Sequence, residues 1–334
     1  MNDQVYHSAM QLVKPLKLGK LELSTNLIQA PLAGVSAAPF RELIHHFGGV
    51  GYCCTEMISA KTLIHKPPKR YITTSNQEGL VCFQLSGNIP EELAQASEVA
   101  VQYGADLIDL NAGCPVDKIR KKGCGSKLLA ESAHLGKLIH AIQSVSTIPV
   151  SVKIRVDGKS GDRFNTEVVQ AVTEAGADFL IVHGRHWTEH YETSVQLDEI
   201  ATIVSVAKIP VIGNGDIKDY ASLKKMFDAT GCHGVMIGRG SVGKPWLFQE
   251  LQQYDQGQTF TSPDAAKIGQ LFLKHVEGLV GLEGEYLAIL QARKLSKYYL
   301  RAAQLDEDLL KNFYNLTKLI DLKNLIIHLF RAHY

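Results

Sequence analysis

With 334 residues, 45% of them hydrophobic and 21% charged, the chain is long enough for a domain of barrel size, about 250 residues, and a smaller second domain. Its formal net charge of +1 argues against a protein whose whole surface attracts nucleic acid, although local basic patches remain compatible with it. Residues 1–25 lack the basic-then-apolar pattern of a signal peptide, and no apolar run reaches the roughly 18 residues of a membrane helix, so we expect a cytoplasmic protein.

The cysteines and histidines predict neither a disulfide framework nor a metal site. Six cysteines occur without a C-x-x-C pair, and three of them lie in or beside apolar runs, where buried free thiols are common. His183, His186 and His190 have a suggestive spacing, but no carboxylate motif accompanies them. We therefore expect no bound metal ion.

Eight short apolar runs, each followed by helix-like sequence, dominate residues 27–250. Such runs are typical of buried parallel strands, and eight strand-helix units predict a (β/α)8 TIM barrel. The runs begin near Leu27, Tyr52, Val81, Leu107, Val150, Phe179, Val211 and Val235.

Polar or glycine-containing segments follow all eight runs. Loops are generally polar, so one such residue carries little information, but eight at one barrel rim predict an active site there. These segments are Ala33-Gly34, Glu56, Gln84, Asn111, Lys153, His183, Asn214-Gly215-Asp216 and Gly238-Arg239.

The segments after the seventh and eighth runs predict a phosphate site. Barrels often bind phosphate there through backbone N–H groups that glycine exposes, and Arg239 adds a positive charge. The alternative is that the glycines only form tight turns. The two segments read Gly213-Asn214-Gly215-Asp216 and Gly238-Arg239-Gly240-Ser241.

Lys153 ends the fifth run and is expected to point toward the barrel mouth. A lysine there can stabilise negative charge, such as that on a reduced flavin, or can form a Schiff base if its pKa is lowered. The amides of Gln84 and Asn111 suit the hydrogen-bonding edge of a flat heterocycle.

The longest interval between runs, about 43 residues, follows Asn111 and is the expected place for a substrate lid. Cys114 lies in its glycine-containing first part, where a reactive thiol is a better interpretation than a buried structural one. A basic run follows, and it predicts binding of an anionic polymer unless it is only a solvated face. This basic run consists of Lys118, Arg120, Lys121, Lys122 and Lys127.

After Gln249 the strand-helix alternation stops, and a polar connection at 254–263 leads into a helical domain. Ser262-Pro263-Asp264 predicts a helix start with Ser262 as the N-cap. We expect helices near 263–280, 285–303 and 306–332.

The second of these helices carries a basic stripe, formed by Arg293, Lys297 and Arg301 at i, i+4 and i+8. Because no acidic partner stands at i+4, the basic stripe is better placed to meet phosphates than to stabilise its own helix. The opposite, apolar face is expected to contain Leu287, Ala288, Ala292, Leu295, Tyr298 and Tyr299.

Seven short motifs in residues 26–250 resemble, in order and position, those of the tRNA-dihydrouridine synthases. The helical tail with Ala292-Arg293-Lys294 is similar to that of the bacterial B-type members. The motifs are Ala30-Pro31-Leu32-Ala33-Gly34-Val35, Phe83-Gln84-Leu85-Ser86-Gly87, Asp109-Leu110-Asn111-Ala112-Gly113-Cys114-Pro115, Val152-Lys153-Ile154-Arg155, His183-Gly184-Arg185, Gly213-Asn214-Gly215-Asp216 and Gly238-Arg239-Gly240.

The resemblance implies an FMN enzyme that reduces the C5–C6 double bond of particular uridines in tRNA, with NADPH or NADH restoring the reduced flavin. It implies an FMN-binding catalytic barrel over residues 1–250, a tRNA-binding helical domain over 251–334 and a monomer. By motif position, the FMN contacts are Ala33, Gln84, Lys153, His183, Asn214, Gly215, Asp216, Gly238 and Arg239.

The resemblance also assigns the substrate side of the site. Asn111, Arg155 and Tyr191 fall where the family grips the uracil, and Cys114 is the family's proton donor. Hydride transfer to C6 leaves enolate-like charge that an acid must quench at C5, and a thiol, mostly protonated at neutral pH, can supply that proton. The basic stripe would then dock RNA phosphates.

Two positions depart from the family pattern. His186-Trp187 follows His183-Gly184-Arg185 where threonine is usual, and Leu197 stands where an aromatic residue is common. Both changes concern the loop after the sixth run and put local RNA contacts in doubt.

Two other functions remain open. One is an FMN barrel acting on a small molecule, of the dihydroorotate dehydrogenase or old-yellow-enzyme kind, and turnover of a free nucleobase would favour it. The other is a non-enzymatic RNA-binding barrel, which would be colourless and unable to bind FMN.

Overall fold

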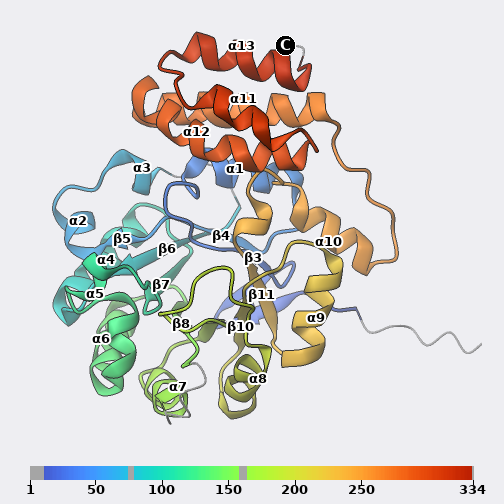
Figure 1. Ribbon diagram of the computed structural model, residues 1–334. Coiled ribbons are helices and arrows are strands. Elements are labelled where there is room, and N and C mark those ends of the chain that lie inside the picture. Colours follow the sequence, from blue (N-terminus) through green and yellow to red (C-terminus); the bar gives the residue numbers. More distant parts are fainter. Residues whose placement is uncertain (1–10, 74–78, 158–163, 333–334) are drawn as a thin grey trace, which may run out of the picture.

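Across residues 11–73, 79–157 and 164–332, which the computed structural model describes, eight parallel strands close into a barrel because the last strand pairs with the first (Figure 1). The predicted TIM barrel is confirmed, and each predicted run begins within one residue of its strand. The strands are β3 (Leu27–Gln29), β4 (Tyr52–Cys54), β6 (Val81–Ser86), β7 (Leu107–Asn111), β8 (Val150–Arg155), β9 (Phe179–His183), β10 (Val211–Asn214) and β11 (Gly234–Ile237). The short β5 (Ile58–Ser59) adds to β6.

An antiparallel hairpin of β1 (Leu16–Leu18) and β2 (Leu21–Leu23) covers the barrel interior at the amino end of its strands. Leu18 and Leu23 are buried there in one apolar cluster with inward-facing residues such as Phe179 and Met236. Hydrophobic side chains fill this end of the barrel. Of the two ends formed by the described residues, the carboxyl end of the strands, which carries the polar groups, is therefore the one available for an active site.

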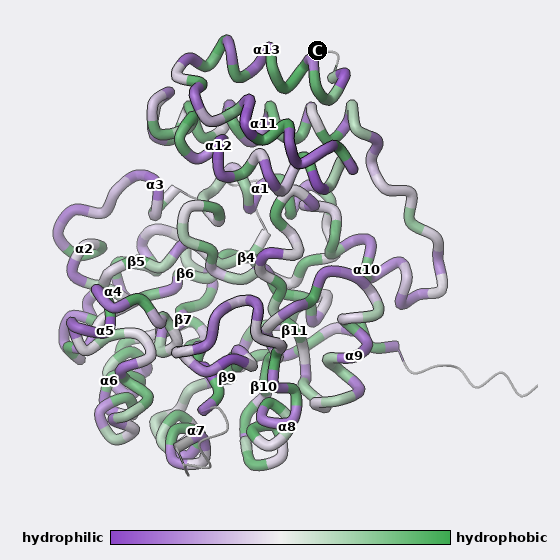
Figure 2. Tube along the Cα trace, in the orientation of Figure 1, coloured by the Kyte–Doolittle hydropathy of each residue, from purple (hydrophilic) through white to green (hydrophobic). Residues whose placement is uncertain are grey.

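Amphipathic helices surround the strands, and in Figure 2 α6, α7 and α8 alternate hydrophobic and hydrophilic residues along their turns. They pack their apolar sides on the barrel. The helices are α1 (Ala38–Phe47), α2 (Ala60–His65), α3 (Lys69–Ile72), α4 (Pro90–Gln102), α5 (Asp117–Arg120), α6 (Ser132–Val145), α7 (Phe164–Glu174), α8 (Leu197–Val206), α9 (Tyr220–Thr230) and α10 (Leu247–Asp255), with the 3-10 turns η1 (Gly125–Ala130) and η2 (Arg239–Ser241).

Three C-terminal helices stack above α1 at the top of Figure 1: α11 (Ala265–Glu283), α12 (Glu285–Ala302) and α13 (Leu319–Phe330). α11 approaches α1 so closely that a Cβ at Gly278 would lie 2.7 Å from Pro39. Within the helical layer the ring of Phe272 stacks on Tyr299 at 4.3 Å. The expected helical C-terminal part is thus present, and it shares a continuous core with the barrel's outer helices.

Several local expectations for this part were wrong. Asp264, whose side chain accepts the N–H of Lys267, caps α11 in place of Ser262. The segment 306–332 is not one helix: the 3-10 turn η3 (Glu307–Phe313) precedes α13. On α12, Leu287 is exposed and Tyr298 only half-buried, because the buried face is turned toward Ile289, Ser296 and Leu300.

Five of the six cysteines are buried free thiols, and Cys114 is partly exposed. Among the helices that the structure describes, none combines the length and hydrophobicity that crossing a bilayer requires.

Candidate active site

The predicted rim residues come together because neighbouring strands are in register at their carboxyl ends. Asn111 pairs with Lys153 across β7 and β8, and His183 pairs with Asn214 across β9 and β10. The Lys153 ammonium donates to Asn214 Oδ1 at 2.9 Å, and the Asn214 amide donates to the carbonyl of Met236 at 2.8 Å. Residues far apart in sequence thus form one polar surface.

A chain of amide hydrogen bonds connects the rim to the loop that carries Cys114. Asn111 Nδ2 donates to Gln84 Oε1 at 2.9 Å. Asn111 Oδ1 in turn accepts the backbone N–H groups of Gly113, at 3.3 Å, and Cys114, at 2.9 Å. Both amides are therefore engaged inside the protein, and Asn111 orients the cysteine loop.

Asp109 lies beneath these amides and was missed by the sequence analysis, which treated it only as part of a motif. It is fully buried and accepts hydrogen bonds from Gln84 Nε2 and Ser151 Oγ, both at 2.7 Å. Burial raises the pKa of Asp109 to about 6, although the two hydrogen bonds and the charge of Lys153 oppose that shift. A carboxyl group within a run of apolar strand residues was the available signal.

Lys153 is a cation in a largely desolvated place. Burial and the nearby Arg155 guanidinium lower the pKa of Lys153 to about 8, and the charge of Asp109 opposes them. The ammonium form still predominates at neutral pH. It can therefore stabilise negative charge that develops on a ligand at the barrel mouth.

His183 is neutral, because burial and the surrounding cations Lys153, Arg155 and Arg185 keep its pKa well below 6.5. Its Nε2 lies 3.4 Å from Nη1 of Arg185, and since a guanidinium only donates, Nε2 must be the acceptor. Nδ1 then carries the proton and is a donor. The sequence analysis did not single out the buried Arg185.

The predicted phosphate end contains strained and tightly packed backbone. Asp216 has a φ of +53°, and a Cβ at Gly215 would lie 2.6 Å from the side chain of Val195. The Asp216 carboxylate forms ion pairs with Arg185 at 2.5 Å and with Arg239 at 3.4 Å. Asp216 thus forms ion pairs with two arginines. The groups suited to bind a phosphate are the backbone around Gly238 and the guanidinium of Arg239.

Arg155 ties together the two loops that flank the mouth. Its Nε donates to the carbonyl of Gly113 at 2.8 Å, and its Nη1 donates to that of His186 at 3.0 Å. On the same side Arg239 lies 4.2 Å over the exposed ring of Tyr191. Arg155 and Tyr191 therefore border the site, whereas Ala33 is exposed beside Gly34 on the opposite loop.

The interval after Asn111 is not one long loop, because α5, η1 and α6 occupy most of it. The basic run is also not uniform. The guanidinium of Arg120 lies 3.3 Å over the ring of Trp187, and Lys127 pairs with Glu131 at 3.8 Å. Lys118, Lys121 and Lys122 are exposed.

The residues in which the chain departs from the family pattern have structural roles. Trp187 provides the surface for Arg120, and the rings of His186 and Trp187 lie 5.4 Å apart and tilted. Leu197 begins α8 and packs against the core. His183, His186 and His190 do not form a metal cluster in the described part of the chain.

The basic stripe is less free than expected. Arg293 donates through Nε to the carbonyl of Leu316 at 3.1 Å, and Arg301 forms an ion pair with Glu307 at 2.5 Å. Lys297 is exposed. Arg293 and Arg301 thus each have a partner within the protein, and RNA docking by the three charges stays a prediction.

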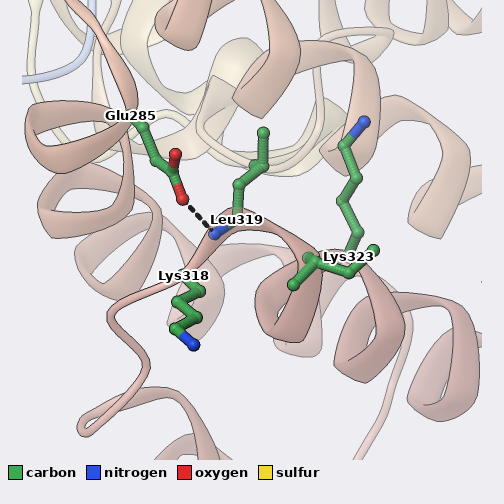
Figure 3. A pocket seen from close by; sticks show the side chains of 5 residues that line it. Glu285, Lys318, Leu319 and Lys323 are labelled. Carbon is green, nitrogen blue, oxygen red and sulfur yellow. Dashed lines mark hydrogen bonds between the residues drawn. The ribbon is translucent and has the colours of Figure 1, made fainter.

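A shallow pocket lies between α12 and α13 (Figure 3), and none of the predicted rim residues is among those that line it. Glu285 Oε1 accepts the backbone N–H of Leu319 at 2.6 Å and so joins the starts of the two helices. Lys318, Ile320 and Lys323 complete its lining.

Comparisons with known proteins agree with this geometry. The family model described as dihydrouridine synthase (Dus) matches residues 28–331. The tRNA-dihydrouridine synthase B of Klebsiella pneumoniae is 32% identical over 301 residues, covering 89% of this chain and 94% of its own. The protein of the same name from Shewanella oneidensis is 34% identical over 288 residues, covering 85% and 89%.

Solved structures with lower sequence identity share the fold. An old yellow enzyme homologue from Zymomonas mobilis superposes with a TM-score of 0.57 at 12% identity, covering 76% of this chain and 95% of its own. Morphinone reductase in complex with tetrahydroNAD gives a TM-score of 0.54 at 14% identity, covering 78% and 94%.

Proposed function

The chain belongs to the dihydrouridine synthase family, and we propose that it reduces the C5–C6 double bond of uridines in tRNA, with FMN as the flavin and NADPH as the reductant. The observation that carries this proposal is the placement of cationic Lys153 and the Cys114 loop on one barrel rim, connected through Asn111. A tRNA substrate also favours a cytoplasmic enzyme.

The rim residues fit FMN. The ammonium of Lys153 can donate three hydrogen bonds, of which the described residues accept one, through Asn214. A Cβ at Gly34 would meet nothing within 4 Å, so the space beside this loop is open. Lys153, His183 and Asn214 would hold the ring, and Gly215, Asp216, Gly238 and Arg239 would organise the phosphate end. Gln84, which we also expected at the ring, is buried below the rim and bonded to Asp109 and Asn111.

FMN, when bound and reduced by NADPH, would supply the hydride for uracil C6. Lys153 holds a positive charge at the mouth, and neutral His183 offers its Nδ1–H as a donor. Cys114 donates the proton to C5 from the loop that Asn111 and Arg155 fix, acting as a general acid. Arg155 and Tyr191, which border this space, position the base that has left the tRNA stack.

The docking of tRNA is assigned to residues outside the rim. We divide the chain into a catalytic barrel over residues 1–250 and an RNA-docking helical domain over 251–334. Exposed Lys297 on α12 and exposed Lys118, Lys121 and Lys122 beside the mouth offer charges for phosphates. RNA docking by these lysines is compatible with the net charge of +1, because a few local cations can bind phosphates without a large positive charge on the whole chain.

The test is to purify the protein, record the flavin spectrum, and incubate it with NADPH and unmodified tRNA. We expect a yellow protein that forms dihydrouridine, and sequencing of tRNA from a deletion strain then locates the uridine. A protein that binds FMN but reduces only free nucleobases or other small molecules would contradict the proposal.

A further inference from the structure

Three buried polar side chains lie side by side on adjacent strands of the barrel wall, one level below the rim. Gln84, Asp109 and Ser151 are register partners on β6, β7 and β8, and all three are at most 1% exposed. None of the roles proposed above involves Asp109. A carboxyl group is costly to bury, so its retention at this level calls for an explanation.

Asp109 determines which way two neighbouring amides face. An ionised carboxylate only accepts hydrogen bonds, so the Gln84 group that faces Asp109 must be its NH₂. The Gln84 oxygen then faces Asn111, which must present its own NH₂. Only in this orientation is the Asn111 oxygen available to the N–H groups of Gly113 and Cys114.

We infer that Asp109 is a positioning residue, which holds the Cys114 loop in its working geometry through the Gln84 and Asn111 amides. The inference rests on the proposed function only where it gives the Cys114 thiol its role as proton donor. If the carboxylate is removed, Gln84 and Asn111 can rotate, and an Asn111 NH₂ would then face the N–H of Cys114 without an acceptor.

The surroundings of Asp109 make this relay sensitive to mild acid. The ionisable groups that interact electrostatically with Asp109 include Lys153 from β8, Cys82 from β6 and Tyr52 from β4. Burial raises the pKa values of Cys82 and Tyr52 well above their usual range, so both stay neutral. The hydrogen bonds from Gln84 and Ser151, and after them the charge of Lys153, favour the ionised form of Asp109 by lowering its pKa. Below about pH 6 the carboxyl gains a proton and no longer accepts with both oxygens.

The decisive comparison is between Asp109→Leu, which removes the acceptor, and Asp109→Asn, which keeps one oxygen for Gln84. The control is Asp106→Asn, the same change at the amino end of the strand, where Asp106 accepts the N–H of Val81. We expect Asp109→Leu to speed amide hydrogen exchange in residues 112–116 and to slow tRNA reduction about 10²-fold. Asp109→Asn should lose less than about tenfold, and Asp106→Asn should match the parent.

The pH profile separates positioning from a general packing effect and needs no drastic variant. In the parent holoenzyme we expect tRNA reduction to fall as the pH drops through about 6. Ser151→Ala removes a hydrogen bond that lowers the pKa of Asp109, so this acid limb should move to higher pH. In Asp109→Asn the limb should vanish.

Parent-like exchange in the loop of Asp109→Leu, or an unchanged acid limb in both Asp109→Asn and Ser151→Ala, would overturn the inference. Hydrogen exchange does not depend on turnover. A parent that forms no dihydrouridine but shows the exchange difference would contradict the proposed function and leave the relay intact.

Discussion

Arg70 in α3 is paired with Glu56 on the barrel rim, and the same guanidinium also binds Glu283 at the end of α11. Nη2 donates to Glu56 Oε1 at 3.0 Å, and Nη1 donates to Glu283 Oε2 at 2.5 Å. Glu56 accepts the N–H of Gly34 as well, in the loop that we expect to line the flavin. One side chain thus connects the C-terminal helices with the rim of the barrel.

Breaking this connection should cost stability, because all three side chains are mostly shielded from water. We expect Arg70→Met to lower the free energy of unfolding by about 3 kcal/mol, since two partly buried carboxylates lose their partner. Urea unfolding measures the change. Lys224→Met, which breaks the exposed Lys224–Asp228 pair, should cost less than about 0.5 kcal/mol, and equal losses would show that the Arg70 pairs behave like surface pairs.

Replacing Cys114 should separate flavin chemistry from base protonation. We expect Cys114→Ala to keep FMN and its reduction by NADPH but to lose tRNA reduction by about 10²–10⁴-fold, the range for a lost general acid. Cys124→Ala is the matched control, because Cys124 is a buried thiol in the same connection. Full dihydrouridine formation by Cys114→Ala would refute the assignment, and loss of flavin would indicate a structural role.

Because of Lys153, both the rate of flavin reduction and the stability of the protein should change with pH in the alkaline range. Its pKa in the folded protein is about 8, below its ordinary 10.5, so the cation that we place beside the flavin is lost as the pH rises through about 8. Flavin reduction should therefore slow on that limb, and Lys153→Met should be slow at all pH values. Stopped-flow absorbance at the flavin band measures this rate.

The effect of rising pH on stability has the opposite sign to its effect on the rate of flavin reduction. Because the folded state releases this proton before the unfolded state does, the burial penalty is full below about pH 8 and is relieved between about 8 and 10.5. Flavin-free parent should thus gain stability over that interval relative to Lys153→Met. A constant difference between the two proteins would contradict the lowered pKa.

The sequence was sufficient for the barrel because strands covered on both sides appear as continuous apolar runs, and Val81–Ser86 or Phe179–His183 can be recognised without tertiary information. Asp109 was not identified, since its role depends on register with Gln84 and Ser151 on other strands. The partner of Arg293 was missed for a related reason. Arg293 donates a hydrogen bond to the carbonyl of Leu316, 23 residues further along the chain, and the helical periodicity of the sequence does not predict that contact.

The revised basic stripe leads to a prediction for single residues of the helical domain. Lys297 is exposed, so Lys297→Gln should weaken tRNA binding without loss of stability and should flatten the slope of log K against log salt by about 0.7 to 0.9. Arg293→Gln should instead destabilise the domain by about 1 kcal/mol, because the Leu316 carbonyl loses a charged donor.

Lys20→Gln is the matched control for the charge, because Lys20 is also exposed but lies in the hairpin turn at the amino end of the barrel. Filter binding of tRNA at several salt concentrations compares the three variants with the parent. If Lys297→Gln and Lys20→Gln both retain the parent's affinity and salt slope, Lys297 is only a solvated residue. The phosphates must then be held elsewhere, and Lys118, Lys121 and Lys122 beside the catalytic loop become the residues to change next, because they are the exposed cations nearest in sequence to Cys114.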